Sequence, residues 1–330
     1  MEAEKNNNIE TLEAMSQEQK RKKKIEIGED GNYIKPTAEQ IEKFERGLET
    51  MSEVFENADF PWYVDGGANI TLYSGEQKRE HKDLDISILK GDLDKLKELL
   101  KNKGFEIAET NHLFIKKINN YDSNNIFNEV DLHVHDIDKD GNLIINYTGA
   151  KFPKEYIEPI KHKILNGKEI NLSHPALVVY HKLYSYEWDR DRVYDIKDLE
   201  QIVDKLEIKD FEILRDILTE EFENRKQKIL AKFDDFWNII STKLQNRDEF
   251  LIKGVLFEDD DVRRNMQNKN KMSTITIQYI DMIARYISDR NYDISRGDFI
   301  NKSIEIIDSL ENAKEKLEIL DHLEKLKNNQ

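Results

Sequence analysis

Residues 62–73 read WYVDGGANITLY, and residues 83–89 read DLDISIL. The first four residues are typical of a short strand, and Ala68–Tyr73 is typical of a helix. Glycines at a strand-to-helix turn allow backbone N–H groups to approach a phosphate at the start of the helix. We therefore expect Gly66 and Gly67 to lie at an anion-binding turn.

The segment DLDISIL carries two carboxylates separated by one residue. Side chains alternate between the two faces of a strand, so Asp83 and Asp85 are predicted to share one face while Leu84 and Ile86 pack on the other. Mg²⁺ prefers oxygen ligands and takes few carboxylates from a protein, because waters and substrate phosphates fill its other positions. The pattern therefore predicts a hard-cation site on a half-buried strand.

A second polar strand is predicted from Glu129 to His135. Alternation places Asp131, His133 and His135 on one face, so Asp131 is the natural third carboxylate. The two histidines could be metal ligands, but surface or hydrogen-bonded histidines fit equally well. A zinc site at His-x-His has no further ligands at a recognisable spacing.

These motifs together resemble the nucleotidyltransferases of the polymerase-β superfamily, in particular the lincosamide and aminoglycoside 2″-nucleotidyltransferases. The double glycine, the run Gly75-x-x-x-Arg79-x-His81 and the Asp83-x-Asp85 pair keep the spacing of that branch. The segment Val130-Asp131-Leu132-His133, followed by residues 136–141, resembles the lincosamide-type continuation. The resemblance covers roughly residues 60 to 150, and it extends to nucleotidyltransferase toxins of abortive-infection systems.

The resemblance implies transfer of a nucleoside monophosphate from an NTP to a hydroxyl acceptor, with release of pyrophosphate. Such a reaction depends on positioning and on neutralising phosphate charge, which metal ions supply. By two-metal logic, Asp83 and Asp85 bridge two Mg²⁺ ions, and Asp131 helps to bind the second ion or accepts the proton of the attacking hydroxyl.

The same resemblance implies roles for the basic and glycine residues. Gly66 and Gly67 cradle the triphosphate through their amides, while Arg79 and His81 orient the phosphates or order the loop before the metal strand. In the second half, a predicted helix starts at His174-Pro175 and carries Lys182. The resemblance suggests that Lys182 reaches the NTP phosphates, with Asp195 and Asp198 in structural roles. A surface lysine is the alternative for Lys182.

Composition limits the class of protein. The chain has 330 residues, of which 38% are hydrophobic and 36% charged, and it contains no cysteine. Disulfides and cysteine-ligated metals are therefore excluded, and with no apolar run of membrane-spanning length we expect a cytoplasmic protein without membrane contact. The formal net charge of −16 disfavours a broad nucleic-acid surface and favours a cationic acceptor such as an aminoglycoside.

Periodicity predicts the organisation of the chain. Residues 1–35 are predicted to form a flexible charged extension that contains the basic run 20–24. Thr37-Ala-Glu-Gln40 is typical of a capping box that opens an amphipathic helix. A second helix, ending at Gly104, and short strands at 105–108, 113–118, 129–135 and 143–146 follow. We expect an α+β fold: a nucleotidyltransferase domain over 36–170, with a small mixed sheet flanked by helices, and an all-α domain over 171–330.

Three function classes remain open. The first is an enzyme that nucleotidylates a small hydroxyl compound such as an antibiotic, and the second is a toxin that modifies tRNA or another macromolecule. The third is a non-catalytic binding module, which the three intact aspartates disfavour. A glycosyltransferase interpretation of the Asp-x-Asp pair also remains, and it differs in requiring a sugar nucleotide rather than a free NTP. The acidic run 258–261 lacks the spacing of an EF-hand and is predicted to be a solvated loop.

Overall fold

The computed structural model describes two compact units of the chain. The described residues are 32–81, 83–109, 113–117, 130–146, 148–164, 167–188, 193–231 and 294–329, with isolated positions between 237 and 290. One unit takes in the chain up to Phe211 together with Leu323–Gln330, and the other comprises Glu212–His322. Almost all of the predicted extension at 1–35 lies outside the described residues, and so does the acidic run 258–261. The domain ranges predicted from the sequence stay predictions.

The first unit is built on a mixed β-sheet. Its main path has the strand order β3-β4-β5-β2-β1-β9-β8, and β6 and β7 extend from β5. The strands are β1 (Trp62–Asp65), β2 (Leu84–Leu89), β3 (Phe105–Glu109), β4 (Leu113–Lys117), β5 (Val130–Ile137), β6 (Leu143–Ile144), β7 (Lys151–Phe152), β8 (Ile160–Lys163) and β9 (Glu169–Leu172). The pairs β2–β5 and β1–β9 are parallel, whereas β1–β2 is antiparallel.

Three of these strands, β7, β8 and β9, have no counterpart in the sequence analysis, which places no strand between 147 and 172. Each has at most four residues, and lysine or glutamate occupies several positions, so none shows a clear apolar alternation. Pairing explains why β9 is nevertheless a strand: it lies beside the central strand β1, where Val64 pairs with Leu172. Tertiary pairing therefore overrides a weak local signal at this position.

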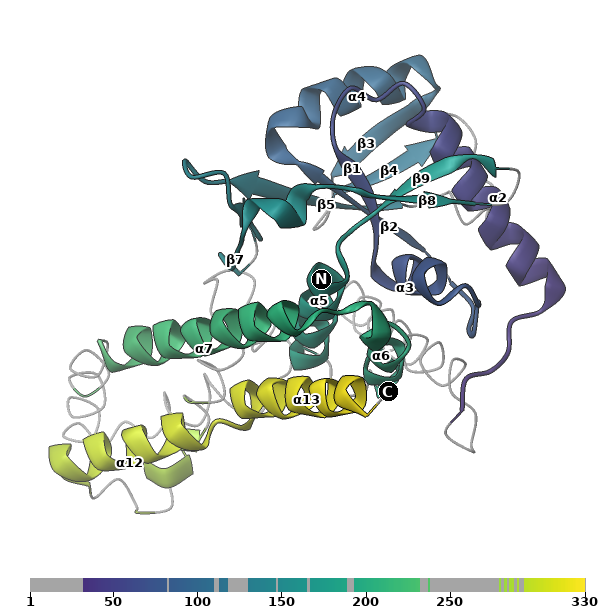
Figure 1. Ribbon diagram of the computed structural model, residues 1–330. Coiled ribbons are helices and arrows are strands. Elements are labelled where there is room, and N and C mark those ends of the chain that lie inside the picture. Colours follow the sequence, from purple (N-terminus) through teal and green to yellow (C-terminus); the bar gives the residue numbers. More distant parts are fainter. Residues whose placement is uncertain are drawn as a thin grey trace, which may run out of the picture. The chain divides into compact units, whose positions relative to one another are not determined.

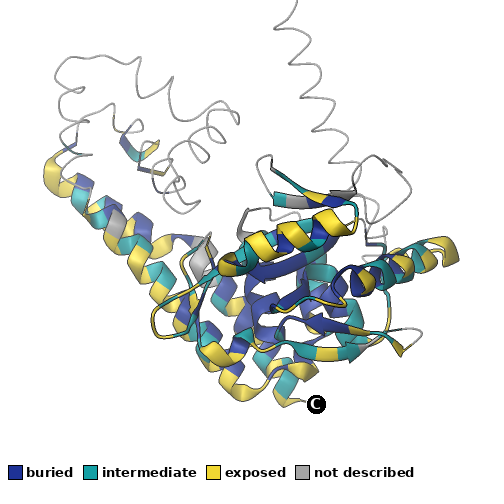
Figure 2. Cartoon of the chain, turned by 90° about the horizontal axis from the view of Figure 1, so that it is seen from above, coloured by how far each residue is buried: buried dark blue, intermediate teal, exposed yellow. Residues whose placement is uncertain are grey.

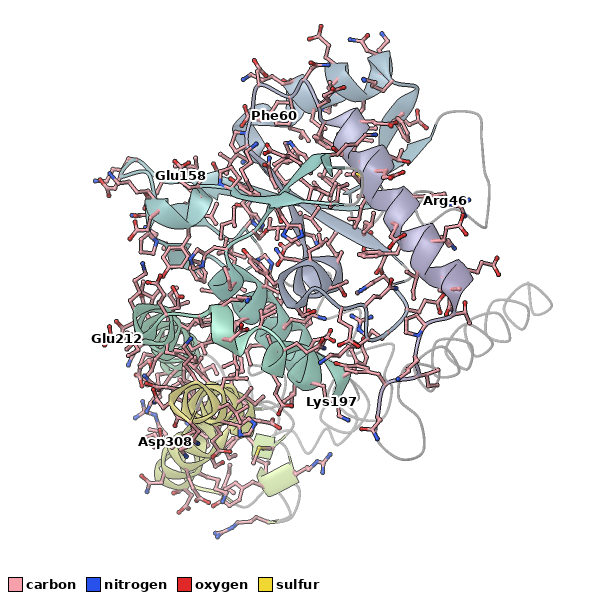
Figure 3. All side chains as sticks on the ribbon, turned by 45° about the vertical axis from the view of Figure 1, so that its right-hand side comes forward. Arg46, Phe60, Glu158, Lys197, Glu212 and Asp308 are labelled. Atoms are coloured by element: carbon pink, nitrogen blue, oxygen red, sulfur yellow. The ribbon has the colours of Figure 1, made fainter. Side chains whose placement is uncertain are left out.

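The first helix, α2 (Ala38–Val54), begins as predicted. Thr37 accepts a hydrogen bond from the amide of Gln40, and the Gln40 side chain accepts one from the amide of Thr37. This reciprocal pair satisfies two of the amides that a helix start leaves without partners. Its apolar stripe, which includes Phe44, Leu48 and Met51, is buried against the sheet, while Arg46 points away from it (Figure 3).

Alternation along the central strands separates an apolar face from a polar one. On β2, Leu84, Ile86 and Ile88 are buried in the hydrophobic core together with apolar residues of α2 and α4 (Leu93–Asn102). Figure 2 shows this buried interior beneath helices whose outer faces are exposed. The alternate residues of β1, β2 and β5 therefore point to the opposite face, and they include every strand carboxylate of the predicted site.

Helices α3 (Gly66–Ser74) and α5 (Pro175–Trp188) lie on the polar face of the sheet, whereas α4 lies on the other face (Figure 1). The Asn69 side chain holds α3 in place, since it donates hydrogen bonds to the carbonyls of Val64 and Ser173. Proline opens α5, as predicted, where its missing N–H costs nothing. The short helix α6 (Val193–Glu200) follows and contacts α5.

The second unit is helical in its described residues. It contains most of α7 (Ile208–Leu230), all of α12 (Arg296–Ser309) and most of α13 (Glu311–Asn328). Its core includes Ile229, Tyr279 and Phe299. The α+β class, with a mixed sheet flanked by helices and a helical C-terminal region, is thus confirmed. Among the described residues, no helix combines the length and the apolarity needed to cross a bilayer.

Candidate active site

Three aspartates meet in register across the central strands. Asp65 at the end of β1 pairs with Asp85 on β2, and Asp85 pairs with Asp131 on β5. Register partners on adjacent strands point to the same face, so the three carboxylates lie side by side. Asp83 stands one residue before β2 and is exposed. The predicted acids are therefore brought to one strand end, and Asp65 joins them.

Asp65 is held in one orientation by its surroundings. Its side chain is fully buried, its Oδ1 accepts a hydrogen bond of 2.8 Å from the amide of Gly66, and its Oδ2 accepts one of 2.7 Å from Ser87 Oγ. Asp65 is thus the N-cap of α3, a position that aspartate favours. This carboxylate is a fixed part of the turn that also contains the double glycine.

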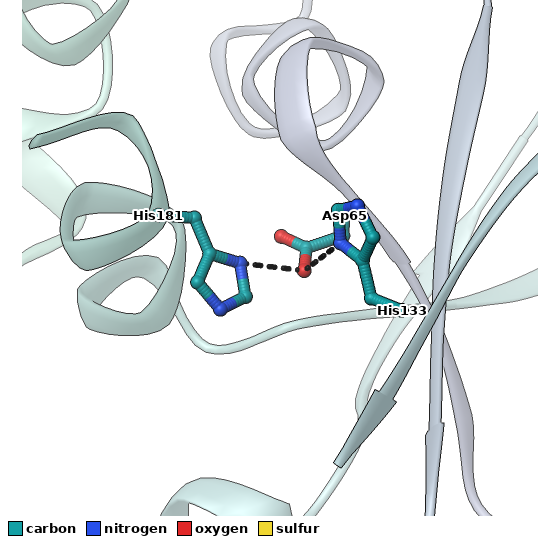
Figure 4. Close-up of side chains that lie close together, drawn as sticks. All are labelled: Asp65, His133 and His181. Carbon is teal, nitrogen blue, oxygen red and sulfur yellow. Dashed lines mark ion pairs between the residues drawn. The ribbon is translucent and has the colours of Figure 1, made fainter. Parts of the chain in front are cut away.

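Two histidines approach Asp65 from different elements. His181 on α5 places Nδ1 at 2.9 Å from Asp65 Oδ2, and His133 on β5 places Nδ1 at 3.7 Å from the same oxygen (Figure 4). The Nε2 atom of His133 lies 3.9 Å from Asp85 Oδ1. His133 therefore stands between two carboxylates. We refer to Asp65, Asp83, Asp85, Asp131, His133 and His181 as the strand-end cluster.

Crowding of carboxylates shifts the ionisation of the strand-end cluster. Burial, together with the nearby carboxylates Asp83, Asp65 and Asp131, raises the pKa of Asp85 to about 6, although His133 opposes the shift. Burial alone would lower the pKa of His133, but the neighbouring carboxylates of Asp65 and Asp85 raise it to about 9. The carboxylates thus outweigh the available positive charge, and a cation at this strand end is favoured.

The double glycine permits two close approaches. At Gly66, whose φ is +61°, a Cβ would lie 1.8 Å from Asp85 Oδ2. At Gly67, a Cβ would lie 2.5 Å from Arg79 Nη2. The amide of Gly66 is used by Asp65, whereas Gly67 is among the first residues of α3, whose amides have no carbonyl partner within the helix. A side chain is therefore excluded at both positions, at Gly66 by the Asp85 carboxylate and at Gly67 by the Arg79 guanidinium.

The predicted basic residues lie in a second cluster of charge. Arg79 donates two hydrogen bonds to Asp198, of 3.2 and 2.9 Å, and Lys182 Nζ lies 2.6 Å from Asp195 and 2.9 Å from Asp198. The hydroxyl of Tyr33 donates to Asp198 as well, at 2.7 Å. Both aspartates come from α6, where Figure 3 marks the neighbouring Lys197. We refer to Arg79, Lys182, Asp195 and Asp198 as the paired cluster.

All four members of the paired cluster are buried, and two cations face two carboxylates. Burial would raise the pKa of Asp198, but Lys182 and Arg79 hold it well below the usual range. His81 lies beside this cluster: its Nε2 is 2.7 Å from Thr71 Oγ1, and its ring packs on Phe44. Burial and the nearby Arg79 lower the pKa of His81 to about 3, so this histidine is neutral.

Part of the first unit matches the model of a known enzyme family. Residues 47–202 match the family model of aminoglycoside-2″-adenylyltransferases. This range contains every residue predicted for the site, from Gly66 to Lys182. The match confirms the predicted resemblance to nucleotidyltransferases and the prediction of an enzyme of that class.

Comparison with curated protein sequences gives no match. Among solved structures, that of the antibiotic-resistance factor ANT(2″)-Ia in solution is 13% identical, covers 57% of this chain and 94% of its own, and has a TM-score of 0.38. The lincomycin-bound lincosamide adenylyltransferase LnuA is 20% identical, with coverages of 48% and 97% and a TM-score of 0.35. A nucleotidyltransferase-like antigen of Paracoccidioides brasiliensis is 18% identical, with coverages of 56% and 90% and a TM-score of 0.38. These TM-scores are too low for the solved structures to support any conclusion beyond that of the family match.

The donor chemistry of the strand-end cluster fits the hard cation that nucleotidyltransferases require. Asp85 and Asp131 are register neighbours, Asp83 heads the same strand, and carboxylate oxygens are the ligands that Mg²⁺ prefers. Among the described residues, however, the set of potential ligands found close together is a different one. It consists of Asp65, His133 and His181, whose possible ligand atoms all lie within 4.8 Å of one another. The assignment of metal to Asp83, Asp85 and Asp131 remains a prediction.

Two residues of the strand-end cluster, Asp65 and His181, were not predicted as site residues. Asp65 was predicted only as the last residue of a strand. Its position directly before a double glycine was the available signal, because aspartate is a preferred N-cap. His181 precedes Lys182 on α5 and lies far from His133 in the sequence, so no ligand spacing links the two. Only the packing of α5 near the sheet reveals that histidine.

Proposed function

We propose that this chain transfers a nucleoside monophosphate from an NTP to a hydroxyl group of a small antibiotic-like acceptor and releases pyrophosphate. The observation that carries the proposal is the family match over residues 47–202, which spans the carboxylates aligned on β1, β2 and β5. An in-line transfer requires positioned groups and an environment that accepts phosphate charge. The strand-end cluster supplies the positioned carboxylates, and metal ions bound there would supply the positive charge.

In this proposal, Asp83, Asp85 and Asp131 would hold two Mg²⁺ ions. When bound, these ions neutralise charge on the phosphates and orient the leaving pyrophosphate. Register places Asp131 beside Asp85, where its carboxylate would either help to bind the second ion or accept the proton of the acceptor hydroxyl. Gly67 offers a helix N-terminal amide to a phosphate oxygen, and Gly66 leaves room for the Asp85 carboxylate.

The geometry favours a positioning role for Arg79, His81 and Lys182. Arg79 and Lys182 are already paired with the aspartates of α6, and His81 is buried between Thr71 and Phe44. Arg79 and His81 precede β2 by a few residues, so these contacts fix the approach to Asp83 and Asp85. We therefore propose that these residues order the loop before the metal strand rather than contact the phosphates.

Mass spectrometry of acceptors tests the proposal. Each of the four NTPs with Mg²⁺ is incubated with aminoglycosides, lincosamides and bulk tRNA, and pyrophosphate is measured in parallel. We expect an NMP adduct on one antibiotic class with the wild-type protein, and none with Asp131→Asn. The matched control is Asp136→Asn, because Asp136 lies on the same strand, on the opposite face, and pairs with the exposed Lys90.

Other outcomes are decisive as well. Adducts on tRNA alone would replace the small acceptor by a macromolecule and support the toxin alternative. No NTP binding by the wild-type protein would contradict the proposed enzyme. Equal activity of Asp131→Asn and Asp136→Asn would remove Asp131 from the reaction.

A further inference from the structure

The residues Asp65, His133 and His181 form a compact set of nitrogen and oxygen donors beside the predicted magnesium ligands. Their possible ligand atoms all lie within 4.8 Å of one another. Figure 4 shows the two imidazoles pointing at the carboxylate from a strand and from a helix, with contacts of 2.9 and 3.7 Å to Asp65 Oδ2. Side chains on such elements are held more firmly than those on loops.

The separations match those between ligands of one tetrahedral metal ion. Bonds of about 2.0–2.1 Å to imidazole nitrogen or carboxylate oxygen, at a tetrahedral angle, place two ligand atoms roughly 3.3 Å apart. The observed 2.9 and 3.7 Å lie on either side of that value. All the candidate ligand atoms lie within 4.8 Å of one another, so the three residues are compatible with one shared ion.

The carboxylate of this set has the supporting contacts that metal ligands require. Asp65 is fully buried, and the amide of Gly66 and the hydroxyl of Ser87 fix its two oxygens. Outer contacts of this kind orient the ligands of metal sites. The side chain of His133 is 35% exposed, which supplies a path by which an ion can enter.

A third imidazole adjoins the set and points to the same conclusion. His135 is 97% buried, its ring stacks on that of His181 at a centroid distance of 5.5 Å, and neither of its nitrogens has a hydrogen-bond partner among the described residues. A buried polar group without a partner is costly. A cation bound at this place would lie close to the two unpartnered nitrogens of His135.

We propose that Asp65, His133 and His181 bind one zinc ion, with His135 adjacent as a further ligand or an outer contact. Two imidazoles and one carboxylate suit Zn²⁺, whereas Mg²⁺ takes oxygen donors and belongs with the predicted aspartate ligands. The zinc site is thus distinct from the site of the proposed function. It adjoins that site because His133 Nε2 lies 3.9 Å from Asp85.

Competition with a chromophoric zinc chelator, without NTP or acceptor, tests the proposal on the full chain. We expect one Zn²⁺ per chain and at least about a hundred-fold loss of affinity in His181→Gln, since even outer-shell changes cost 10–100-fold. The matched control is His162→Gln on β8, a histidine outside this set, which should keep wild-type affinity. Far-UV circular dichroism of each metal-free variant verifies that it is folded.

The wild-type protein offers a second readout that needs no variant. X-ray absorption at the zinc edge should show imidazole nitrogen and carboxylate oxygen at about 2.0–2.1 Å. Absence of stoichiometric binding would leave two Asp–His ion pairs and overturn the proposal. Equal affinity of His181→Gln and His162→Gln would do the same, as would loss of zinc binding in Asp83→Asn with both histidines intact. None of these outcomes depends on transferase activity, so this proposal and the proposed function fail separately.

Discussion

The strand-end cluster and the paired cluster both draw on helix α5, through the neighbouring residues His181 and Lys182, yet their charges are balanced differently. The paired cluster sets two cations against two carboxylates, all buried and in direct contact. The strand-end cluster sets four carboxylates against two imidazoles, and Asp83 and His133 are partly open to solvent. A balanced buried cluster stabilises the fold, whereas an unbalanced and accessible one is suited to bind a cation.

Neutralising a carboxylate at the strand end should give the largest effect, and it should fall on activity. We expect Asp85→Asn to lower the rate of nucleotidyl transfer at least about a thousand-fold, which is about 4 kcal/mol of transition-state free energy. The free energy of unfolding should stay the same or rise, because a crowded set of carboxylates loses one charge. Single-turnover kinetics and urea unfolding measure the two quantities. A transfer rate of Asp85→Asn within ten-fold of the wild-type rate would show that the strand-end cluster does not serve activity.

Removing a cation from the paired cluster should act on stability instead. Lys182→Met leaves Asp195 and Asp198 buried with one partner fewer, and we expect the free energy of unfolding to fall by about 3 kcal/mol or more. The matched control is Lys90→Met, because the pair of Lys90 with Asp136 is exposed, so solvent screens it and its loss should change stability little. Equal stability of the two variants in urea would show that the buried pairs do not stabilise the fold.

The two glycines sharpen the comparison, since each adjoins a different cluster. In Gly66→Ala the new methyl group collides with the Asp85 carboxylate and the backbone keeps an unfavourable positive φ, so transfer should fall roughly a hundred-fold. In Gly67→Ala the methyl group displaces the Arg79 guanidinium, and stability should fall by about 1–3 kcal/mol. Kinetics and urea unfolding of both variants are compared. The reverse assignment, with Gly67→Ala the less active and Gly66→Ala the less stable, would contradict the account.

The smallest effect concerns pH and His81, beside the paired cluster. Its pKa is lowered to about 3 in the fold, so the unfolded chain binds the proton more readily and stability is lost as pH falls below about 6.5. Between pH 7.5 and 5.5 this one group should cost roughly 1 kcal/mol. In His81→Gln the loss over that interval should be smaller by this amount. Urea unfolding at both pH values is the measurement, and identical losses would show that His81 is not held neutral.

Much of this arrangement was predictable from local pattern. The capping box at Thr37 and Gln40 forms as expected, and the strands carrying Asp85 and Asp131 follow the predicted alternation. The acids could be grouped because they sit on short polar strands within one recognisable motif. Short-range patterns of this kind encode where a side chain points.

The remainder depends on contacts distant in the sequence. His181 reaches Asp65 only because α5 packs near the sheet, and Arg79 meets Asp198 across more than a hundred residues. The sequence predicts that Arg79 orients the phosphates or orders the loop before the metal strand, and that Lys182 reaches the phosphates or is a surface lysine. The structure pairs both with aspartates of α6. Residue type could not distinguish a phosphate-binding cation from one that is neutralised by a buried aspartate, because both need the same side chain.

Binding of Mn²⁺, a paramagnetic substitute for Mg²⁺, tests the central claim most directly. Electron paramagnetic resonance follows free Mn²⁺ with and without a non-hydrolysable NTP. We predict NTP-dependent binding by the wild-type protein, loss of that binding in the double variant Asp83→Asn/Asp85→Asn, and retention in folded Lys182→Met and His181→Gln. Binding by the double variant that equals the wild type would contradict the account, because the strand-end carboxylates would then not hold the cation.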